Sequence, residues 1–474
     1  MGVAGLLGFG ALALVAYGIG DEGTVRLYNH FVWQALAFLD GRAAIDYPVA
    51  AVGDLPGNEF FQDVLPLTGP SGEPTGGGLI PFPPLPAILL MPFAAVWGLR
   101  TDAQAIAGVL GAVDVAVAWW MLGRLPIGTA VRAVTTLFFG FGTVFFYTAE
   151  LGTTWYFAHV IAVGLGLLAV GLAVGADPDA SRTEDQRGHP PTPRYPVGRG
   201  EPRRSLHATV SRLPELIDRR QLVIGFVFGL ACTARLTMAF AAPFFLLVGA
   251  GGSWLARGAS AAIGAAIPIG ALILYNLVST GHLFHPAYEY LYLTEAAGYP
   301  TLGYNLAWGI EDPRYIPQNL SIALLSTPVF MPDLIPAALG DHTPLCTEPG
   351  AIRGLFDEDC PLLLPRDTGM SLLLASPAYL LALPAIRHLG VQSRLVTGAA
   401  VGVLLVFVVN LMHFSQGWVQ FGYRFSNDFV PFALPVVALG IQLGRHRRLL
   451  VAGLVGASIA INVWGAVWGA LLGW

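Results

Sequence analysis

The chain carries a series of nearly uncharged apolar runs, each about as long as a membrane-spanning helix. The first run reads MGVAGLLGFGALALVAYGIG, and similar runs cover 103–122, 155–175, 395–412 and 449–472. Only 12% of all residues are charged, whereas a soluble globular protein carries about 25%. Because lipid offers the backbone no hydrogen-bonding partner, a chain that crosses it in such runs must be helical. The predicted fold class is therefore an all-α polytopic membrane protein.

One segment breaks this pattern. Residues 176–221 hold nine arginines and many prolines without apolar periodicity, which is typical of a disordered cytoplasmic linker. We therefore expect an N-terminal membrane half over 1–175 and a C-terminal membrane half over 222–474. The first apolar run has no basic leader and no small-residue cleavage site, so we expect it to be retained as the first span.

The placement of arginines orients the spans. Counted outward from the linker, the positive-inside rule predicts about eleven spans and places two large loops, 21–101 and 279–368, on the extracytoplasmic face. To place the loop 21–101 outside, this count of spans requires the proline-rich stretch 79–99 to be a broken, partly re-entrant element that does not cross the membrane. If that stretch were a full span, the first loop would face the cytoplasm instead.

Two cysteines lie close together in the second loop. Cys346 and Cys360 bound the polar stretch CTEPGAIRGLFDEDC. A disulfide between them would close a short ring and would require an oxidising compartment, while two free thiols are the alternative. We expect the disulfide, and with it a multi-pass location in a bacterial inner membrane with both loops outside the cytoplasm.

The residues after the first run, DEGTVRLYNHFVWQALAFLDGR, combine two acids with a helical pattern. Their apolar side chains recur at helical spacing while the polar ones face elsewhere, which predicts an amphipathic helix at the membrane interface. Asp21 and Glu22 would then lie in its first turn, where the helix dipole stabilises an ionised carboxylate. These acids either cap the helix or serve the chemistry of the protein.

The order of motifs resembles a known family. The Asp-Glu pair is followed by ALAFLDGRAAIDYP and PFPPLPAILLMPF, and later by YNLVSTGHLFHPAYEY and GWVQFGYRFSNDFVPF. This layout is similar to the GT-C glycosyltransferases, above all to the protein mannosyltransferases and the aminoarabinose transferases. The resemblance implies a GT-C fold with interfacial helices in two outer loops, and a polyprenyl-phosphate sugar as donor. The family often has Lys or His before its Pro-Pro-Leu element, where this chain has Phe82.

The resemblance places the general base in the first outer loop, at Asp21 or Glu22. A carboxylate there could take the proton of an acceptor hydroxyl while the hydroxyl oxygen bonds to the sugar C1. A groove that excludes water would raise the pKa of such a carboxylate towards a useful value. Asp40, Asp46 and Asp63 lie in the same loop and are alternatives, although Asp40 precedes a glycine and is typical of a turn.

A lipid phosphate as leaving group requires cations on the same face. Arg424, beside Tyr423 in FGYRFSND, is expected at the outer end of a span, where a guanidinium can bind phosphate oxygens bidentately. The alternative is that Arg424 forms a structural pair with Asp428. Arg235 is the second candidate cation, because a charge between two apolar spans is costly and usually functional.

The sugar could be bound by the second loop, in the stretch HLFHPAYEYLYLTEAAGYP. Its candidate contacts are His285, Tyr288 and Glu289, although an aromatic belt at the membrane interface would explain the tyrosines equally well. Glu150 and His159 flank the short outer turn ELGTTW and could complete the cavity. These side chains come from distant parts of the sequence, so their meeting is an expectation of the family layout.

No cofactor can be assigned from the sequence. HExxH, paired CxxC and DxD-type clusters do not occur, so a divalent cation such as Mg²⁺ or Mn²⁺ is left open. There is no phosphate-binding glycine loop of the Walker type, and no nucleic-acid partner is expected. The expected partners are the lipid bilayer, a polyprenyl-phosphate sugar, and an acceptor that is a glycan, a lipid or a protein.

The predicted function is an inverting hexosyl or pentosyl transferase that moves a sugar from a polyprenyl-phosphate donor to a cell-envelope acceptor. A transporter or flippase of a lipid-linked substrate is the alternative, and it would show related halves and ionisable residues along a central path. A non-catalytic envelope scaffold is a third interpretation. The unequal halves, and charges gathered at one face, favour the enzyme.

Overall fold

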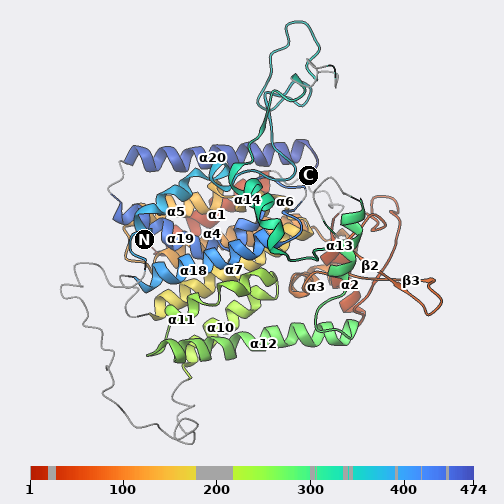
Figure 1. Ribbon diagram of the computed structural model, residues 1–474, viewed down its shortest axis with the longest axis horizontal. Coiled ribbons are helices and arrows are strands. Elements are labelled where there is room, and N and C mark those ends of the chain that lie inside the picture. The colour runs from red at the N-terminus through yellow and green to blue at the C-terminus, as the bar shows by residue number, and fades with distance from the viewer. Residues whose placement is uncertain are drawn as a thin grey trace, which may run out of the picture.

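The protein is an elongated helical bundle. The computed structural model describes residues 2–19, 28–177, 217–298, 307–334, 345–389, 393–417, 419–444 and 448–474, together with 305 and 340. Its helices run side by side along the longest axis of the molecule (Figure 1). Helices from both sides of the expected linker pack together, since α7 (Thr154–Ala176) lies against α10 (Arg219–Cys232).

Within the described residues, six helices are long and apolar enough to cross a membrane, which makes this a multi-pass membrane protein. They are α1 (Gly2–Ile19), α4 (Ala103–Leu122), α7, α12 (Trp254–Thr280), α18 (Arg394–Met412) and α20 (Arg448–Leu471). A seventh span results if α5 (Thr129–Gly142) and α6 (Phe145–Leu151), which meet at 50°, are one broken element. The expected total of about eleven would need shorter apolar helices to cross as well.

Shorter helices fill the rest of the bundle and its loops. The proline-rich stretch forms α3, which is shorter than the candidate spans, and whether it crosses the membrane stays a prediction. Residues 372–386 form a chain of three short helices, α16, η6 and α17, because Pro377 and Pro384 interrupt a continuous helix. The shorter helices with their bounds are α2 (His30–Leu39), α3 (Leu85–Trp97), η1 (Gly98–Arg100), η3 (Leu236–Ala241), α11 (Phe244–Leu247), α13 (Ala287–Gly298), η5 (Pro313–Tyr315), α14 (Ile316–Leu325), α16 (Leu372–Ala375), η6 (Pro377–Ala382), α17 (Leu383–Ile386), η7 (Arg424–Asp428) and α19 (Val430–Leu443).

Two small antiparallel sheets qualify the all-α expectation. In the first loop, β1 (Ile45–Asp46), β2 (Leu65–Thr68) and β3 (Pro74–Leu79) form a sheet with the order β1-β3-β2. Ile45 and Pro66 both pair with Gly78 on the central strand. In the second loop, β4 (Val329–Phe330) pairs with β5 (Leu363–Leu364), and the Cys346–Cys360 disulfide lies between these two strands in sequence. The predicted disulfide is confirmed.

The two ends of the bundle carry different structures. Helices α2, α3 and α13 and the three-stranded sheet lie at the right-hand end in Figure 1, which we call the loop end. The chain turns tightly at the opposite end, where Arg394 lies 3.4 Å from Asp177 and the backbone NH of Gly249 donates to the same carboxylate. Short segments at this opposite end are basic, through Arg124, Arg132, Arg219, Arg220, Arg394 and Arg448.

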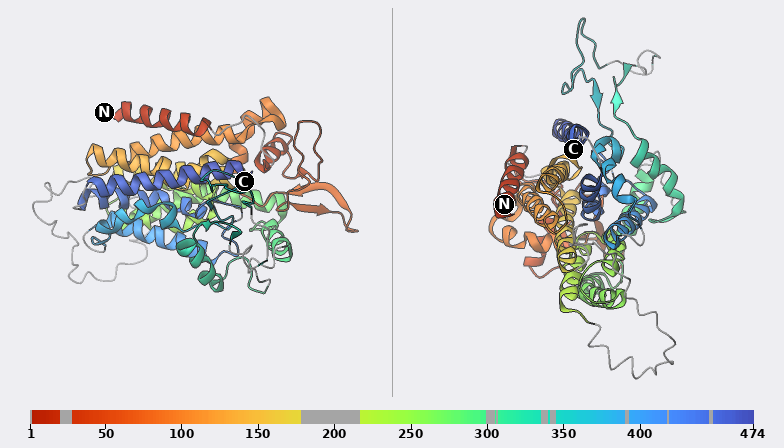
Figure 2. Two further views of the ribbon diagram at one scale, coloured as in Figure 1. Left: turned by 90° about the horizontal axis from the view of Figure 1, so that it is seen from above. Right: turned by 90° about the vertical axis from the view of Figure 1, so that its left-hand side faces the viewer.

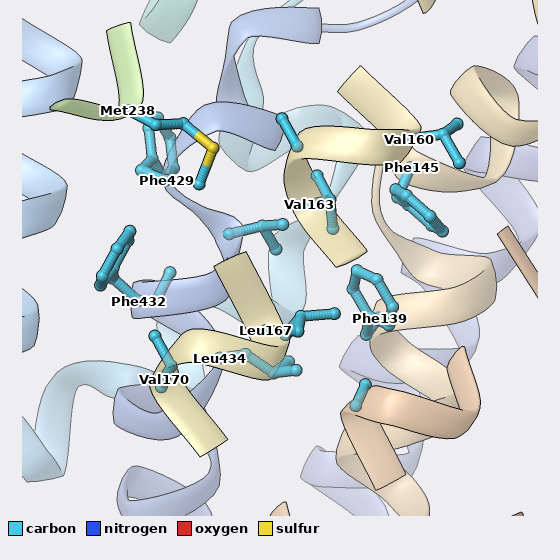
Figure 3. Packing of buried hydrophobic residues seen from close by; sticks show 14 of the residues in the cluster. Phe139, Phe145, Val160, Val163, Leu167, Val170, Met238, Phe429, Phe432 and Leu434 are labelled. Atoms are coloured by element: carbon cyan, nitrogen blue, oxygen red, sulfur yellow. The ribbon is translucent and has the colours of Figure 1, made fainter. Parts of the chain in front are cut away.

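The buried core centres on α7. This helix is the most buried of the candidate spans, with 78% of its apolar window inside the protein. In Figure 3, Leu167 of α7 lies between Phe139 on α5 and Leu434 on α19, and Val163 lies further along the same helix. Because protein packs against α7 on nearly all sides, the first turns of this helix are held rigidly at the loop end. The candidate site is built on those turns.

Helices α10 and α12 pack backbone against backbone. A Cβ added at Gly264 of α12 would lie 2.0 Å from the carbonyl oxygen of Leu222, and one added at Gly225 of α10 would lie 2.1 Å from that of Ala261. Small residues allow such close approach, which is a common way of joining helices in membranes. This contact holds α10, and therefore Arg235 just beyond its end, in a fixed position.

We expect Gly264→Ala to lower the unfolding free energy by about 1–3 kcal/mol, because backbone atoms cannot move aside as a flexible side chain can. Gly270 on the same helix has no atom within 4 Å of an added Cβ, so Gly270→Ala is the matched control and should not destabilise. Thermal unfolding of the two detergent-solubilised variants measures the difference. Equal melting temperatures would contradict the proposed packing of α10 on α12.

Candidate active site

A pocket lies at the loop end, where segments far apart in sequence converge. Its cavity volume is about 30 Å³, and the space around it, including the open solvent at its mouth, is about 310 Å³. Its walls come from the start of α3, the first turns of α7, the turn between α10 and η3, and α13. We call it the aromatic pocket; its lining residues are Phe82, Pro83, Thr154, Trp155, Ala158, Ala234, Arg235, Leu236 and Tyr288.

A buried hydrogen-bonded pair fixes the first loop to α7 beside this pocket. Nε2 of His30 lies 2.7 Å from Oδ1 of Asp63, and both side chains are almost fully buried. Because a carboxylate only accepts, Nε2 must carry a proton. The indole Nε1 of Trp155 donates to the other oxygen of Asp63 at 3.1 Å. This His30–Asp63 clamp therefore holds the Trp155 ring at the wall of the pocket.

Helix α2 differs from the expected surface helix. It begins at His30, and Tyr28 and Asn29 lie outside it. The prediction that Asp21 and Glu22 lie in the first turn of this helix is therefore wrong. It is also buried on most sides, including Gln34, which donates to the hydroxyl of Tyr275 on α12 at 3.2 Å. The helix lies under the first loop and against α3 and α12, and this packing cannot be read from its periodicity.

A second buried charge lies behind the pocket. The carboxylate of Asp428, fully buried, accepts two bonds from Arg235, Nε to Oδ1 at 3.1 Å and Nη2 to Oδ2 at 3.0 Å. Thr237 donates its hydroxyl to Oδ2 at 2.7 Å, Asn410 donates at 3.4 Å, and Nδ1 of His159 lies 3.0 Å from Oδ1. We call this group the Asp428 hub. It presents Arg235 to the pocket in one orientation.

The charge of Asp428 is stabilised by its neighbours. Burial alone would raise the pKa of the carboxyl group, but the guanidinium of Arg235 and the hydrogen bonds outweigh burial and hold that pKa well below its usual value. The same interaction raises the pKa of Arg235 although burial opposes it. Arg235 and Asp428 therefore remain a charged pair at neutral pH.

Arg424 is a buried cation of a different kind. Its side chain is only 9% exposed, and its Nε and Nη1 have no hydrogen-bonding partner among the described residues. The guanidinium lies 5.5 Å from the ring centre of Tyr156 and 5.3 Å from that of Phe425. Gly417, at φ +90°, leaves room for it, because an added Cβ would lie 2.6 Å from Cζ of Arg424. The alternative expectation was a structural pair between Arg424 and Asp428. In the structure the Asp428 carboxylate pairs with Arg235 instead.

The two arginines lie near one another. The Arg235 guanidinium is 5.5 Å from the ring centre of Phe425, the ring that Arg424 also approaches. The ring centre of His159 is 6.2 Å from that of Phe425. Arg235 lines the aromatic pocket and Arg424 does not.

The expected first-loop bases fall into three groups. Asp21 and Glu22 lie outside the described residues, so their role stays a prediction. Asp40 and Asp46 are exposed and pair with Arg42, at 3.2 and 2.7 Å. Asp63 is buried in the His30–Asp63 clamp, and it is the first-loop carboxylate that the structure places beside the pocket.

The second loop contributes less to the pocket than expected. Tyr288 lines it, and burial raises the pKa of the Tyr288 phenol to about 12. His285 is buried, which lowers its pKa to about 4 and keeps the imidazole neutral. Its Nδ1 accepts from the backbone NH of Ala287, which leaves the proton on Nε2. Glu289 is exposed on α13 and does not line the pocket.

Three other predicted site residues do not line the pocket. Glu150 is on α6, where Gln104 of α4 donates to its carbonyl oxygen, and it does not line the pocket. Tyr423 is fully buried, with its ring against Phe407 and Phe425. Its hydroxyl has no partner among the described residues. His159 acts through the Asp428 hub instead of facing the pocket directly.

The sequence alone did not single out His30, Trp155 or the central position of Asp428. His30 stands inside an apolar helix, and its stacking on Phe61, with ring centres 3.7 Å apart, is a long-range contact without a local signal. Asp428 had a visible signal, as an acid next to an apolar run, but its partner is 193 residues away in sequence. Only the assembled bundle shows that pairing.

Metal binding stays open. Among the described residues there is no group of three or more His, Cys, Asp or Glu side chains that could hold an ion. The first-loop acids Asp21 and Glu22 are outside that search. No step below is routed through a metal.

Comparisons with known proteins give only distant similarity. No protein-family model matches the chain, and no curated protein matches it. Two structures of the oligosaccharyltransferase from Archaeoglobus fulgidus resemble it, one tethered to an acceptor peptide with the NVT sequon, the other, AglB, in complex with an inhibitory peptide and a dolichol-phosphate.

Both structures are 12% identical to this chain, with TM-scores of 0.47 and 0.46. The matches cover 98% of this chain but only 55% and 56% of the other two, so the chain spans about half the length of the proteins that it matches. TM-scores below 0.5 assign neither an activity nor a substrate. The function is therefore inferred from the residues of this chain.

We expect Asp428→Asn to lower the unfolding free energy by about 3 kcal/mol at neutral pH, because it keeps the shape of the side chain but leaves Arg235 without its counter-charge. The lower end of the usual range applies because Arg235 is 21% exposed. The pKa of Asp428 is depressed, so its contribution is complete above about pH 4 and is lost as the pH falls further.

Chemical or thermal unfolding between pH 3 and 8 tests this expectation. The difference between wild type and Asp428→Asn should be constant above about pH 5 and should shrink below about pH 4. Asp46→Asn, which removes an exposed partner of Arg42, is the control and should behave as wild type. A difference that grows towards acid pH would show that the hub does not hold a charged carboxylate.

Proposed function

We propose that this protein is an inverting glycosyltransferase that moves a sugar from a polyprenyl-phosphate donor to a cell-envelope acceptor on the extracytoplasmic face. The observation that carries the proposal is Arg424. A buried guanidinium with two N–H groups lacking a partner in the described part of the chain is costly, unless an anion occupies the site during function.

The chemistry of Arg424 favours a phosphate. A guanidinium stays charged in a low-dielectric environment and binds phosphate oxygens through two parallel bonds. Its position inside a membrane bundle favours an anion that arrives from the bilayer, because a lipid-linked phosphate can leave its hydrocarbon chain among the lipids. This agrees with the donor class that the GT-C resemblance of the sequence implies.

The aromatic pocket is a suitable place for the sugar. Phe82, Trp155 and Tyr288 supply apolar ring surface, and the edge of Arg235 supplies polar contacts. The His30–Asp63 clamp and the Asp428 hub each orient one wall of this pocket. Arg235 and Arg424, which approach the same Phe425 ring, would then lie around the bond that links the sugar to the phosphate.

The proposed reaction is a single displacement. The acceptor oxygen bonds to C1 of the sugar as the bond from C1 to the phosphate oxygen breaks, with inversion at C1, and the polyprenyl phosphate leaves with the bonding electrons. Asp21, or failing it Glu22, takes the proton of the acceptor hydroxyl. Arg424 and Arg235 stabilise the negative charge of the departing phosphate.

Sidedness is part of the proposal. The short basic segments of the bundle lie at the end opposite the pocket, which by the positive-inside rule is the cytoplasmic end. The Cys346–Cys360 disulfide in the second loop is typical of an oxidising compartment. Both observations support a pocket outside the cytoplasm, in a bacterial inner membrane.

Arg424→Met is the decisive variant. It keeps the length of the side chain but removes the charge, so we expect turnover of a polyprenyl-phosphate sugar to fall by at least about 100-fold. Thermal stability without donor should stay level or rise, because an unpaired buried charge is gone. Transfer from radiolabelled polyprenyl-phosphate mannose or arabinose, incubated with a membrane extract as acceptor source, measures the activity.

Arg314→Met is the matched control, since Arg314 is exposed in the second loop and pairs with Asp312. It should retain both activity and stability. A variant Arg424→Met that unfolds easily, yet turns over normally per folded molecule, would show that Arg424 is structural. A transporter would move the lipid-linked sugar without consuming it, so unconsumed donor in the wild type would contradict the enzyme itself.

The base is tested separately. We expect Asp21→Asn combined with Glu22→Gln to abolish transfer while binding of polyprenyl phosphate is kept, because the base acts on the acceptor and not on the phosphate. Asp40→Asn combined with Asp46→Asn removes two exposed acids of the same loop and should leave transfer unchanged. Full activity of the Asp21 and Glu22 double variant would move the role of base to another carboxylate, first to Asp63.

A further inference from the structure

The second loop carries an apolar surface that the proposed reaction does not use. We define the disulfide hairpin as residues 345–364, which include the Cys346–Cys360 bridge and strand β5. Four large apolar side chains on it are exposed: Ile352 at 88%, Phe356 at 51%, Leu355 at 50% and Leu345 at 45%. A surface of this kind usually marks a binding site.

The hairpin is an ordered element. Inside it, the backbone NH of Gly354 donates to the carbonyl of Cys360 at 2.9 Å, and that of Leu362 donates to Gly354 at 2.7 Å. Arg353 donates to the carbonyl of Pro361 at 2.9 Å. With the disulfide closing the loop, little conformational freedom is left, so the apolar side chains are held outward in advance of binding.

Its direction is informative. The hairpin projects from the side of the bundle, past α20 and roughly perpendicular to the helices, in the views of Figures 1 and 2. Only 33% of the apolar window of α20 is buried in protein, so the outer face of this helix is left for lipid. An element that reaches sideways beyond that face extends over the surrounding bilayer and not over the bundle.

The tryptophans of α20 indicate how deep the hairpin lies along the membrane normal. The indole of Trp468 donates to the carbonyl of Leu355 at 2.9 Å, which attaches the hairpin to α20 near the C-terminal end of that helix. Helix α20 has 24 residues and is therefore about 36 Å long, more than the roughly 30 Å of hydrocarbon in a bilayer. Trp464 and Trp474, both partly exposed at this end, are placed as in the aromatic belts of membrane interfaces.

We propose that the disulfide hairpin binds the lipid–water interface beside α20, with Ile352 and its apolar neighbours inserted among the lipids. The charges of the hairpin indicate which lipid headgroups it can approach. Glu348, Asp357, Glu358 and Asp359 make it acidic, so anionic headgroups would repel it, and the attraction is apolar. The hairpin therefore anchors the second loop to the neutral surface of the outer leaflet, independently of catalysis.

Depth-dependent quenching tests this proposal in the full-length protein. A fluorophore attached at Ile352→Cys, in a Cys232→Ala background and in nanodiscs of zwitterionic lipid, should be quenched several-fold by lipids with a nitroxide near the headgroup. The matched control is Glu348→Cys on the same hairpin, which should be quenched little. Replacing part of the lipid by an anionic one should not increase quenching at position 352.

Two outcomes would overturn the proposal. The label at 352 could be as water-exposed in nanodiscs as in an amphipol without bilayer, which would mean that lipid does not cover it. It could instead be shielded in the amphipol too, which would mean that a second copy of the protein covers it.

Hydrogen exchange of the unmodified protein is the second measurement. Amides 351–356 should be protected in nanodiscs and not in the amphipol. This measurement needs no added cysteine, so it does not depend on whether labelling disturbs the disulfide.

Discussion

The arrangement at the loop end depends on one constraint, that a charge inside an apolar bundle needs a partner. Asp428 meets this constraint with bonds from Arg235 and Thr237 on one segment and Asn410 on α18, and with His159 of α7 close by. These contacts join the C-terminal helices to α7 and α10. Removing Arg235 would leave the buried Asp428 carboxylate without its counter-charge, so the hub also fixes where the walls of the pocket meet.

Seen from this constraint, Arg424 is the exception that points to function. It is only 9% exposed, yet the carboxylate four residues further along the chain is already taken by Arg235. A folded protein tolerates such a group when a ligand supplies the missing charge. The hub therefore orients Arg235, and because Asp428 is already taken, it leaves Arg424 without that carboxylate. We propose that the phosphate of the donor binds Arg424 instead.

The core explains why these charges can be held so closely. Helix α7 is packed on almost every side, and its first two turns carry Trp155 and His159, one at the pocket and one at the hub. The close approach of α10 to α12 through glycines fixes the turn that carries Arg235. The disulfide hairpin, which we infer to rest on the bilayer, would hold the second loop, and with it Tyr288, near the membrane surface.

The sequence by itself determined the membrane class, the bounds of α4 and nearly those of α7, α18 and α20, and the disulfide, because these follow from local composition and spacing that tertiary contacts do not alter. It also named Arg235, Arg424 and Tyr288, since charges and aromatic residues at the ends of apolar runs are visible locally. Only the tertiary structure decided that Asp428 pairs with Arg235 and not with Arg424, that α2 is buried, and that His30 and Asp63 meet beside Trp155. Those choices depend on which distant segments share one end of the bundle, and a linear pattern does not encode this.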